Sequence, residues 1–564
     1  MAEEKKEGLS RLGIFAVSSP EDVQDLSDLT EETDSEDDSS KVFTVRRGML
    51  MASLYLALYL PTLNQTIVST ALPKILSEIN VHGSDIGYTW IGSAYALAQA
   101  MMLPLFGKLA RTPGRKWALL VAMSVFMLGS ALCGASGNIE MMLASRTIQG
   151  LGAGGVSGLC FVLVMELVRV RGVGKYSELI AAAWAIVAAI GPFLGGTLSE
   201  KANWRWCFFM NVPISVICAI TIWVLLPSVH TDPGFRRAFR AFDLCGVMII
   251  GVGKVLVTLG FQWAIQNESW TSPEVLTTLL AGAGALGAFV PVEMSASSPV
   301  VPFSFLKHRT RVGSYVSTFF HSIAFSGLNY WLPLYFQAVK QQSASESGIS
   351  MLAWTLSFAI ISAAAGFVII AMKRYLEIIW SGFILACIAC ALLTILNPQT
   401  PMAIVAVLLA VAGTGFGPNF NSPLIPIHAS FDISLENYES ILMQSTEAYT
   451  FLRSLGSSIG ISASGLVFFE DLAQHQLPTL SVFNMTQAIE NAHNLTLVEE
   501  SANVEVLHGA MQHVFIQVCV VMGIGLSLSF LIRRHPFTSN TEGDEEDDGI
   551  RSTPRVDSFG IEDG

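Results

Sequence analysis

The stretch "MLMASLYLALYLPTLNQTIVST", residues 49–70, holds no charged residue and is long enough to cross a lipid bilayer as one helix. Similar apolar runs, separated by charged residues or by Gly, Pro and Asn, recur along the 564 residues of the chain. Hydrophobic residues make up 52% of the sequence and charged residues only 14%, which is more apolar surface than soluble cores can bury. The sequence therefore predicts an all-α integral membrane protein.

Counting these runs predicts fourteen transmembrane helices. We place them at residues 49–70, 88–107, 117–136, 139–165, 177–198, 206–227, 243–265, 274–293, 312–337, 348–371, 378–396, 402–420, 446–469 and 508–532. The predicted domains are an acidic disordered cytoplasmic tail (1–45), an N-terminal six-helix bundle (46–228), a basic cytoplasmic link with two inserted helices (229–295), a C-terminal six-helix bundle (296–535) and a second acidic disordered cytoplasmic tail (536–564). The tails carry about half of the acidic residues, so the net charge of -13 does not describe the membrane body.

The distribution of Lys and Arg orients these spans. Basic residues gather in the loops that follow even-numbered spans, and such loops stay in the cytoplasm. Both tails are then cytoplasmic. Three sequons, at Asn267, Asn484 and Asn494, fall in loops that this orientation places outside, so they are predicted glycosylation sites.

Sequence motifs for catalysis are missing from the chain. It has no Walker phosphate loop, no Ser/His/Asp arrangement and no metal-binding H-E-x-x-H, so we expect no enzyme activity, no cofactor and no metal. A large membrane body with a few polar residues in its spans is typical of a secondary transporter.

Four short stretches identify the kind of transporter. They are "GKLARTPGRKW" (107–117), "SRTIQGLGAGG" (145–155), "AIVAAIGPFLGGTL" (185–198) and "NWRWCFFMNVP" (203–213). Their order and spacing, with "LNQTIVSTALP" in the first span, resemble the major facilitator superfamily, and specifically the fourteen-span drug:proton antiporters of fungi. The resemblance covers nearly all of residues 45–535. It implies two bundles that rock about a substrate site near the midplane, with the inserted pair between them in sequence.

The fifth predicted span carries Gly191, Pro192, Gly195 and Gly196. Gly and Pro at these positions remove a backbone donor and bulky side chains, which permits a bend and close helix approach. The resemblance implies that they form the antiporter motif. The alternative is that Gly and Pro are simply common in membrane helices.

The loop after the second span contains Gly107, Lys108, Gly114, Arg115 and Lys116. In the family this cytoplasmic loop helps to latch the two bundles and to control their rocking. The alternative reading is a cluster of cations that only sets orientation. Where the family usually has an aspartate, this chain has Arg111.

Asn64 and Arg146 lie at similar predicted depths, about six and seven residues from the outer ends of their spans. The family commonly has a proton-binding aspartate where this chain has Asn64, and it gives Arg146 an acidic neighbour. An amide cannot carry a proton but can donate and accept hydrogen bonds. Asn64 and Gln65 are therefore predicted either to recognise substrate or to bond across helices.

Arg146 motivates a further hypothesis, because a buried cation needs partners. We expect it to contact an anionic or strongly hydrogen-bond-accepting substrate oriented by Asn64 and Gln65; the alternative is bonding to carbonyl groups and water. Glu178, just inside the fifth span, is the candidate substitute proton carrier. Lys254 in the seventh span is expected to snorkel or to add a second buried cation.

Several aromatic and polar residues are predicted to face the centre of the protein, although some of them must be packing or interface residues. They are Tyr88, Trp90, Tyr95, Gln99, Asn329, Tyr330, Asn419 and Asn421. Rings with a few amides suit organic molecules of moderate size.

The leading functional prediction, implied by the resemblance, is export of a drug, toxin or secondary metabolite in exchange for protons. The expected partners are this small organic substrate, protons and the lipid bilayer, without nucleic acid, and the expected oligomeric state is a monomer. A plasma-membrane location is expected first. Two alternatives stay open: vacuolar uptake of basic amino acids, which would place the same topology in the vacuolar membrane, and a non-transporting membrane sensor or scaffold.

Overall fold

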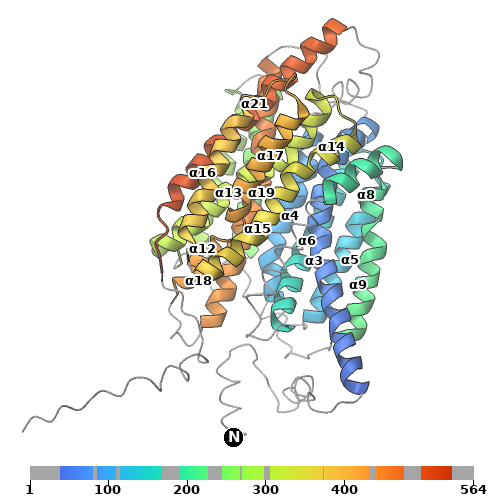
Figure 1. The fold of residues 1–564 in the computed structure, drawn as a ribbon, viewed down its shortest axis with the longest axis vertical. Coiled ribbons are helices and arrows are strands. Elements are labelled where there is room, and N and C mark those ends of the chain that lie inside the picture. The colour runs from blue at the N-terminus through green and yellow to red at the C-terminus, as the bar shows by residue number, and fades with distance from the viewer. Residues whose placement is uncertain are drawn as a thin grey trace, which may run out of the picture.

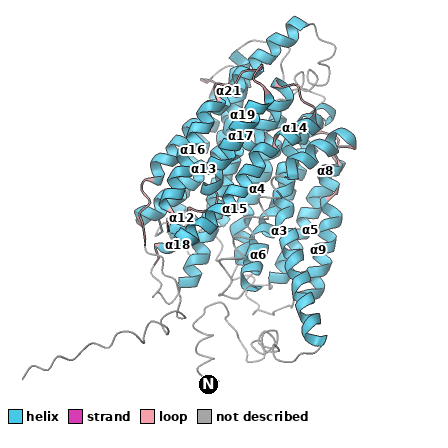
Figure 2. Ribbon diagram, in the orientation of Figure 1, coloured by secondary structure: helices cyan, strands magenta, loops and turns pink. Residues whose placement is uncertain are grey.

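A computed structural model of the chain describes residues 38–79, 86–109, 115–167, 187, 190–226, 244–266, 270–296, 305–372, 374–431, 438–474 and 497–535. Figure 2 shows that the regular structure in these ranges is helical throughout. Most of the helices run roughly along the long axis of the molecule (Figure 1). The prediction of an all-α protein is confirmed.

The helices of the first half, in chain order, are α3 (Asp38–Ile79), α4 (Ile86–Leu109), α5 (Arg115–Ala135), α6 (Ile139–Leu167), α8 (Trp206–Phe209) and α9 (Asn211–Leu225). Residues 190–201 are also helical and correspond to the fifth predicted span. The inserted pair is α11 (Leu244–Gln266) and α12 (Pro273–Ser295).

The second half contains η2 (Phe305–Lys307), α13 (Arg309–Leu334), the π-helical turn η3 (Tyr335–Val339), α14 (Ala344–Ser350), α15 (Leu352–Met372), α16 (Leu376–Leu393), α17 (Met402–Phe416), η4 (Gly417–Asn419), α18 (Leu424–Ala429), α19 (Tyr438–Gln474) and α21 (Leu497–Ser529).

Within the described ranges, nine helical stretches are long and apolar enough to cross a membrane. They correspond to the third, sixth to eighth and tenth to fourteenth predicted spans. The other predicted spans coincide with α3, α4, α6, α13 and the helical residues 190–201. The helices of the structure therefore fit the fourteen predicted from the sequence.

Two groups of helices stand side by side, coloured blue to green and yellow to red in Figure 1. Helices α3, α4, α5, α6, α8 and α9 contact one another, as do α13, α15, α16, α17, α19 and α21. We refer to these groups as the N-terminal and C-terminal bundles; the residue limits given for them above stay predictions. The pair α11 and α12 packs together, and α11 also contacts α4 and α19, one helix from each bundle.

Glycines explain the close packing of α6 within the N-terminal bundle. A Cβ added to Gly150 would lie 2.5 Å from the carbonyl oxygen of Tyr95, and one added to Gly154 would lie 2.5 Å from that of Gln99, both on α4. On the opposite side, a Cβ on Gly152 would overlap the backbone of α5 at Phe126. The run "GLGAGG" therefore lets α6 approach two helices at backbone distance.

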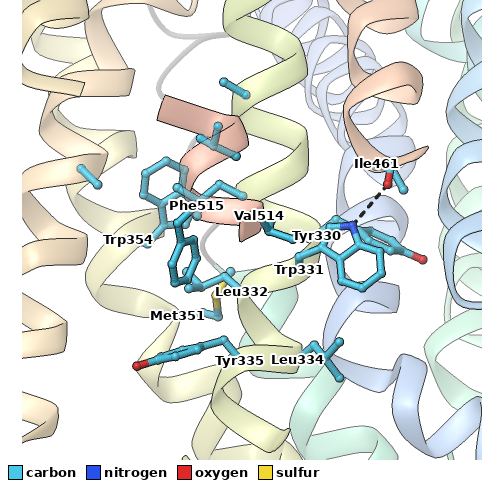
Figure 3. Close-up of a cluster of buried hydrophobic side chains, with 14 of the residues drawn as sticks. Tyr330, Trp331, Leu332, Leu334, Tyr335, Met351, Trp354, Ile461, Val514 and Phe515 are labelled. Atoms are coloured by element: carbon cyan, nitrogen blue, oxygen red, sulfur yellow. Dashed lines mark hydrogen bonds between the residues drawn. The ribbon is translucent and has the colours of Figure 1, made fainter. Parts of the chain in front are cut away.

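One hydrophobic core joins the two bundles near their predicted outer ends. It includes Ile67 and Leu72 of α3, Tyr88 of α4, and Leu328 and Trp331 of α13, all buried. Figure 3 shows the part of this core around Trp331, whose indole nitrogen donates a hydrogen bond to the Ile461 carbonyl oxygen over 3.2 Å. The bundles are thus held together on the side predicted to face outside.

Candidate functional site

Asn64 of α3 and Arg146 of α6 are in direct contact at the centre of the N-terminal bundle. The Oδ1 atom of Asn64 accepts a hydrogen bond from Nη1 of Arg146. Gln149 Oε1 accepts from the same nitrogen at 2.5 Å, and the Ile91 carbonyl oxygen of α4 accepts from Nε at 3.1 Å. The guanidinium carbon lies 4.2 Å from the centroid of the Tyr95 ring. Four residues on three helices, α3, α4 and α6, thus surround a single buried cation.

This cluster is closed and polar. Only 1% of Arg146 and none of Asn64 is exposed. Gln149 continues the network, because its Nε2 donates to Ser130 Oγ on α5 over 2.7 Å. Within the described ranges, Arg146 makes no hydrogen bond to a carboxylate, and the Asn64 Nδ2 group has no hydrogen-bond partner.

The structure therefore shows Arg146 in the second of its two predicted arrangements, bonded to neutral oxygen atoms of the protein. Amide and carbonyl oxygens satisfy its N–H groups without a carboxylate, which limits the cost of burying the charge.

Gln65 lies next to Asn64 in the chain but contacts the other bundle. Its Nε2 donates to Ser457 Oγ of α19 over 3.3 Å, and Ser457 Oγ also accepts from Ser326 Oγ of α13 over 2.6 Å. Two successive residues of α3 therefore contact different bundles: Asn64 bonds Arg146 in its own bundle, and Gln65 bonds Ser457 in the other. Gln65 is the residue of the predicted substrate group that crosses the interface.

The other residues predicted to face the centre make contacts either within their own bundle or with the opposite bundle. Gln99 stays within its bundle and donates to Ser157 Oγ over 3.3 Å, while Asn329 accepts from the Trp354 indole over 3.1 Å. Tyr95 donates to the Pro61 carbonyl oxygen over 2.9 Å, so it holds α4 against α3. Tyr88 and Tyr330 meet at the outer end, and Asn419 bonds the backbone of α16 at Ile379 and Phe383.

The sequence left two arrangements open for both Trp90 and Lys254. Trp90 turns toward the inserted helix α11, where its indole donates to Gln262 Oε1 over 2.5 Å. Lys254 does not snorkel: only 4% of it is exposed, and its ammonium donates to Ser462 Oγ over 3.1 Å. Both residues lie where α11 packs on α4 and α19. Lys254, Thr258 and Gln262 recur every four residues along α11, so this polar stripe was the signal in the sequence for the buried face.

The glycines of the predicted antiporter motif lie at helix contacts. A Cβ on Gly195 would overlap the carbonyl oxygen of Ile67 on α3, and one on Gly191 would overlap Thr66. Gly196 faces the other bundle, where an added Cβ would overlap the Ala344 carbonyl oxygen of α14. Conversely, a Cβ on Gly348 of α14 would lie 2.5 Å from the Pro192 carbonyl oxygen. The motif therefore seats the fifth span between α3 and α14.

Three hydrogen bonds cross between the bundles near the same end. Tyr330 Oη donates to the Tyr88 carbonyl oxygen over 2.6 Å, and Gln337 Nε2 to the Thr70 carbonyl oxygen over 3.1 Å. The third runs from the Ser345 backbone N–H to Glu200 Oε2 over 2.8 Å. Together with the glycine contacts, they close the end of the interface predicted to face outside.

The cytoplasmic loop and several other predicted residues fall partly or wholly outside the described ranges. Gly107 and Lys108 belong to the last turn of α4, and Arg115 and Lys116 begin α5. The residues that lie outside the described ranges are Gly114, Arg111, Glu178, Asn267, Asn484 and Asn494. Their predicted roles stay predictions.

A cluster of rings in the C-terminal bundle was not predicted from the sequence. Phe325 of α13 lies 4.8 Å from Phe358 of α15 and 5.8 Å from Phe420, measured between ring centroids. Trp354 and Phe416 extend the cluster, with their centroids 5.2 Å apart. These residues come from three separate helical segments, so spacing along the chain gives no sign that they meet.

The sequence of this chain is similar to a known family of transporters. A family model described as Major Facilitator Superfamily matches residues 54–461. The chain is 32% identical to "Efflux pump dotC" of Dothistroma septosporum over 443 residues, which cover 78% of this chain and 74% of that protein. It is 30% identical to "Efflux pump FUS6" of Gibberella fujikuroi, covering 82% of both chains.

Solved structures show the same fold. A bacterial homologue of the human lysosomal transporter Spinster, in an inward-facing and occupied conformation, superposes with a TM-score of 0.60 at 12% sequence identity. The match covers 86% of this chain and 96% of that one.

Proposed function

Because this chain belongs to the major facilitator superfamily it is a multi-pass membrane transporter and not an enzyme, and we propose that it exports a small organic compound in exchange for protons. The proposed mechanism is alternating access: the two bundles rock so that one site between them opens to each side of the membrane in turn.

The observation that carries this proposal is the nature of the contacts at the outer end of the bundles. They are made by a shared hydrophobic core, by glycines at backbone distance and by single hydrogen bonds such as Gln337 to Thr70. Each hydrogen bond of this kind contributes only about 1 kcal/mol net, and the ion pairs between described residues, His513–Asp471 and Arg534–Glu377, both lie within the C-terminal bundle. Such an interface is more typical of a transporter whose bundles move than of a rigid scaffold.

Export is favoured by two relatives that are named efflux pumps and that this chain matches over 74% and 82% of their length. The alternative of basic amino-acid uptake into a vacuole is disfavoured by charge. Arg146 and Lys254 are buried, and Arg453 is partly buried, in α6, α11 and α19, and cations in a low-dielectric interior repel a cationic cargo. An uncharged or anionic organic compound fits this interior better.

Proton exchange requires a group that binds and releases a proton. Asn64 cannot do so, and its partner Arg146 is bonded to neutral oxygens. We therefore keep Glu178 as the proposed carrier, because it is the acidic residue that the sequence places just inside the span carrying the Gly191 to Gly196 motif.

The test uses the full-length protein in sealed proteoliposomes loaded with a panel of fluorescent organic compounds. We expect compound movement that accelerates when a pH gradient is imposed and that loses this acceleration in Glu178→Gln. Movement that ignores the gradient would contradict proton exchange but keep transport, and no movement of any compound by folded protein would contradict export.

A further inference from the structure

Arg146 of the N-terminal bundle and Arg453 of the C-terminal bundle differ in how many hydrogen bonds their guanidinium groups make. Arg146 is enclosed and has three protein acceptors. Arg453 of α19 is partly exposed, and within the described ranges its hydrogen-bond partner is Asn421 Oδ1, at 3.3 Å. A guanidinium presents a planar fork of N–H donors, so most of the donors of Arg453 remain available.

Arg453 lies on the face of α19 that meets the other bundle, and its guanidinium contacts Asn421, Phe420 and Tyr449 of its own C-terminal bundle. Arg453 and Ser457 are four residues apart and share one face of α19. Ser457 accepts the hydrogen bond from Gln65 of α3, so this face is the one that meets the N-terminal bundle. Arg453 lies one turn from that contact, on the side predicted to face the cytoplasm, where an exported compound must enter.

Aromatic rings flank the Arg453 guanidinium. Its central carbon lies 4.4 Å from the centroid of the Phe420 ring and 5.9 Å from that of Tyr449. Phe420 packs edge to face on Phe358, with centroids 5.3 Å apart, and both belong to the ring cluster around Phe325. A partly exposed guanidinium with one hydrogen bond therefore lies beside a buried cluster of aromatic rings.

We propose that Arg453, with Asn421 and the Phe420 ring, forms the substrate subsite, and that it binds aromatic compounds carrying an anionic oxygen such as a carboxylate or phenolate. The guanidinium would bond the oxygen, and the aromatic part of the substrate would lie against the exposed side of the guanidinium, next to Phe420. This assigns to Arg453 the recognition role that the sequence suggested for Arg146. It rests on the proposed export function, whose substrate class it specifies.

The proposal is tested by equilibrium binding to the full-length protein in lipid nanodiscs, without any gradient. The probes are three fluorescent compounds with one ring system: anthroate, its neutral carboxamide and the cationic aminomethylanthracene. We expect anthroate to bind more tightly than both others. In Arg453→Gln we expect its dissociation constant to rise about tenfold or more, because a charge-assisted hydrogen bond is lost, with little change for the carboxamide. Arg453→Lys should give a smaller loss, because charge is kept without the fork.

Asn421→Asp keeps the test decisive if Arg453→Gln does not fold. It places a carboxylate beside the guanidinium, which should stabilise the protein while it competes with anthroate and leaves carboxamide binding unchanged. Arg374→Gln, which removes an exposed arginine, is the matched control and should bind all three probes as the wild type does.

Equal affinity of the wild type for anthroate and its carboxamide, or no binding of anthroate at all, would overturn the proposal. So would anthroate affinity that neither Arg453→Gln nor Asn421→Asp changes. Because binding is measured without transport, Arg453-dependent binding by protein that moves no compound would contradict export alone. Transport by protein whose anthroate binding ignores Arg453 would contradict this subsite alone.

Discussion

Lys254 of the inserted helix α11 donates a hydrogen bond to Ser462 of α19, and its ammonium lies 5.3 Å from the centroid of the Trp90 ring on α4. One side chain of the inserted pair therefore touches both bundles. A buried cation held by one hydroxyl and one ring is costly, and such a residue in a membrane helix is commonly functional.

The first prediction concerns this contact. Ser462→Ala removes the acceptor of a buried ammonium and should lower the melting temperature of the purified protein, by an amount equivalent to roughly 1–3 kcal/mol. Lys254→Met replaces the charge by an apolar chain of similar length and should be neutral or stabilising. In the double variant the loss caused by Ser462→Ala should largely disappear. Equal losses from Ser462→Ala with and without Lys254 would show that the two side chains are not coupled.

A second prediction concerns Asn64. Asn64→Leu removes an acceptor from Arg146 and should destabilise the protein by roughly 1.5–3 kcal/mol, measured by thermal unfolding in detergent. Asn64→Asp keeps the shape and adds a charge-assisted bond, so the melting temperature should rise. Ser69→Ala is the control, because Ser69 is buried on the same helix and bonds only the Thr66 carbonyl oxygen. A loss in Asn64→Leu no greater than that in Ser69→Ala would mean that Arg146 finds another acceptor.

A third prediction tests the outer contact of the fifth span. Gly196→Ala places a Cβ against the backbone of Ala344, which cannot rotate away, so the bundles should fail to close at this end. We expect transport in proteoliposomes to fall at least tenfold while the protein still inserts and folds. Gly284→Ala in α12 is the control, since a Cβ there meets nothing within 4 Å. A wild-type transport rate in Gly196→Ala would contradict the prediction that transport requires close contact of the bundles at their outer end.

A fourth prediction is a pH dependence at the same end. Burial raises the pKa of the Glu200 carboxyl, but hydrogen bonds from Ser345 and Ser343 and the charge of Lys201 outweigh it, so the pKa lies below its usual value of 4.5. The carboxylate therefore stabilises the closed end above that value, and this contribution is lost as the external pH falls through the lowered pKa. Fluorescent labels on the outer ends of the bundles should report separation as the external pH falls through this lowered pKa. Glu200→Gln should abolish that step, and a step of the same size in this variant would assign the titration to another group.

The sequence predicted how deep in the membrane a residue lies better than it predicted which neighbouring helix its side chain contacts. Helical rise alone put Asn64 and Arg146 at one level, and the structure joins them by a hydrogen bond. Hydropathy located the helices, because lipid requires continuous apolar runs. The faces of the helices were harder to predict, and in α11 a signal was missed: Lys254, Thr258 and Gln262 recur every four residues and mark the face that is buried in the structure.

In the candidate site, too, the sequence located the residues but did not predict their partners. Gln65 was predicted to bond either substrate or another helix, and only the packing of α3 against α19 gave it Ser457 as a partner. The ring cluster around Phe325 depends on contacts between α13, α15 and the segment around η4. Such contacts between distant segments are set by tertiary packing, which no local pattern in the sequence encodes.

The helix α12 carries one more consequence, since most of its surface is exposed and only 11% of its apolar window is buried. Glu274 and Glu293 stand at its two ends, about 28 Å apart along the axis at ~1.5 Å of rise per residue. That length is close to the hydrocarbon thickness of an average bilayer, which is about 30 Å. A thicker or thinner membrane would therefore pull on α12 first, and α12 would pass the strain to α11 and Lys254. Lipid thickness thus becomes a physical variable to which the rate of bundle movement responds.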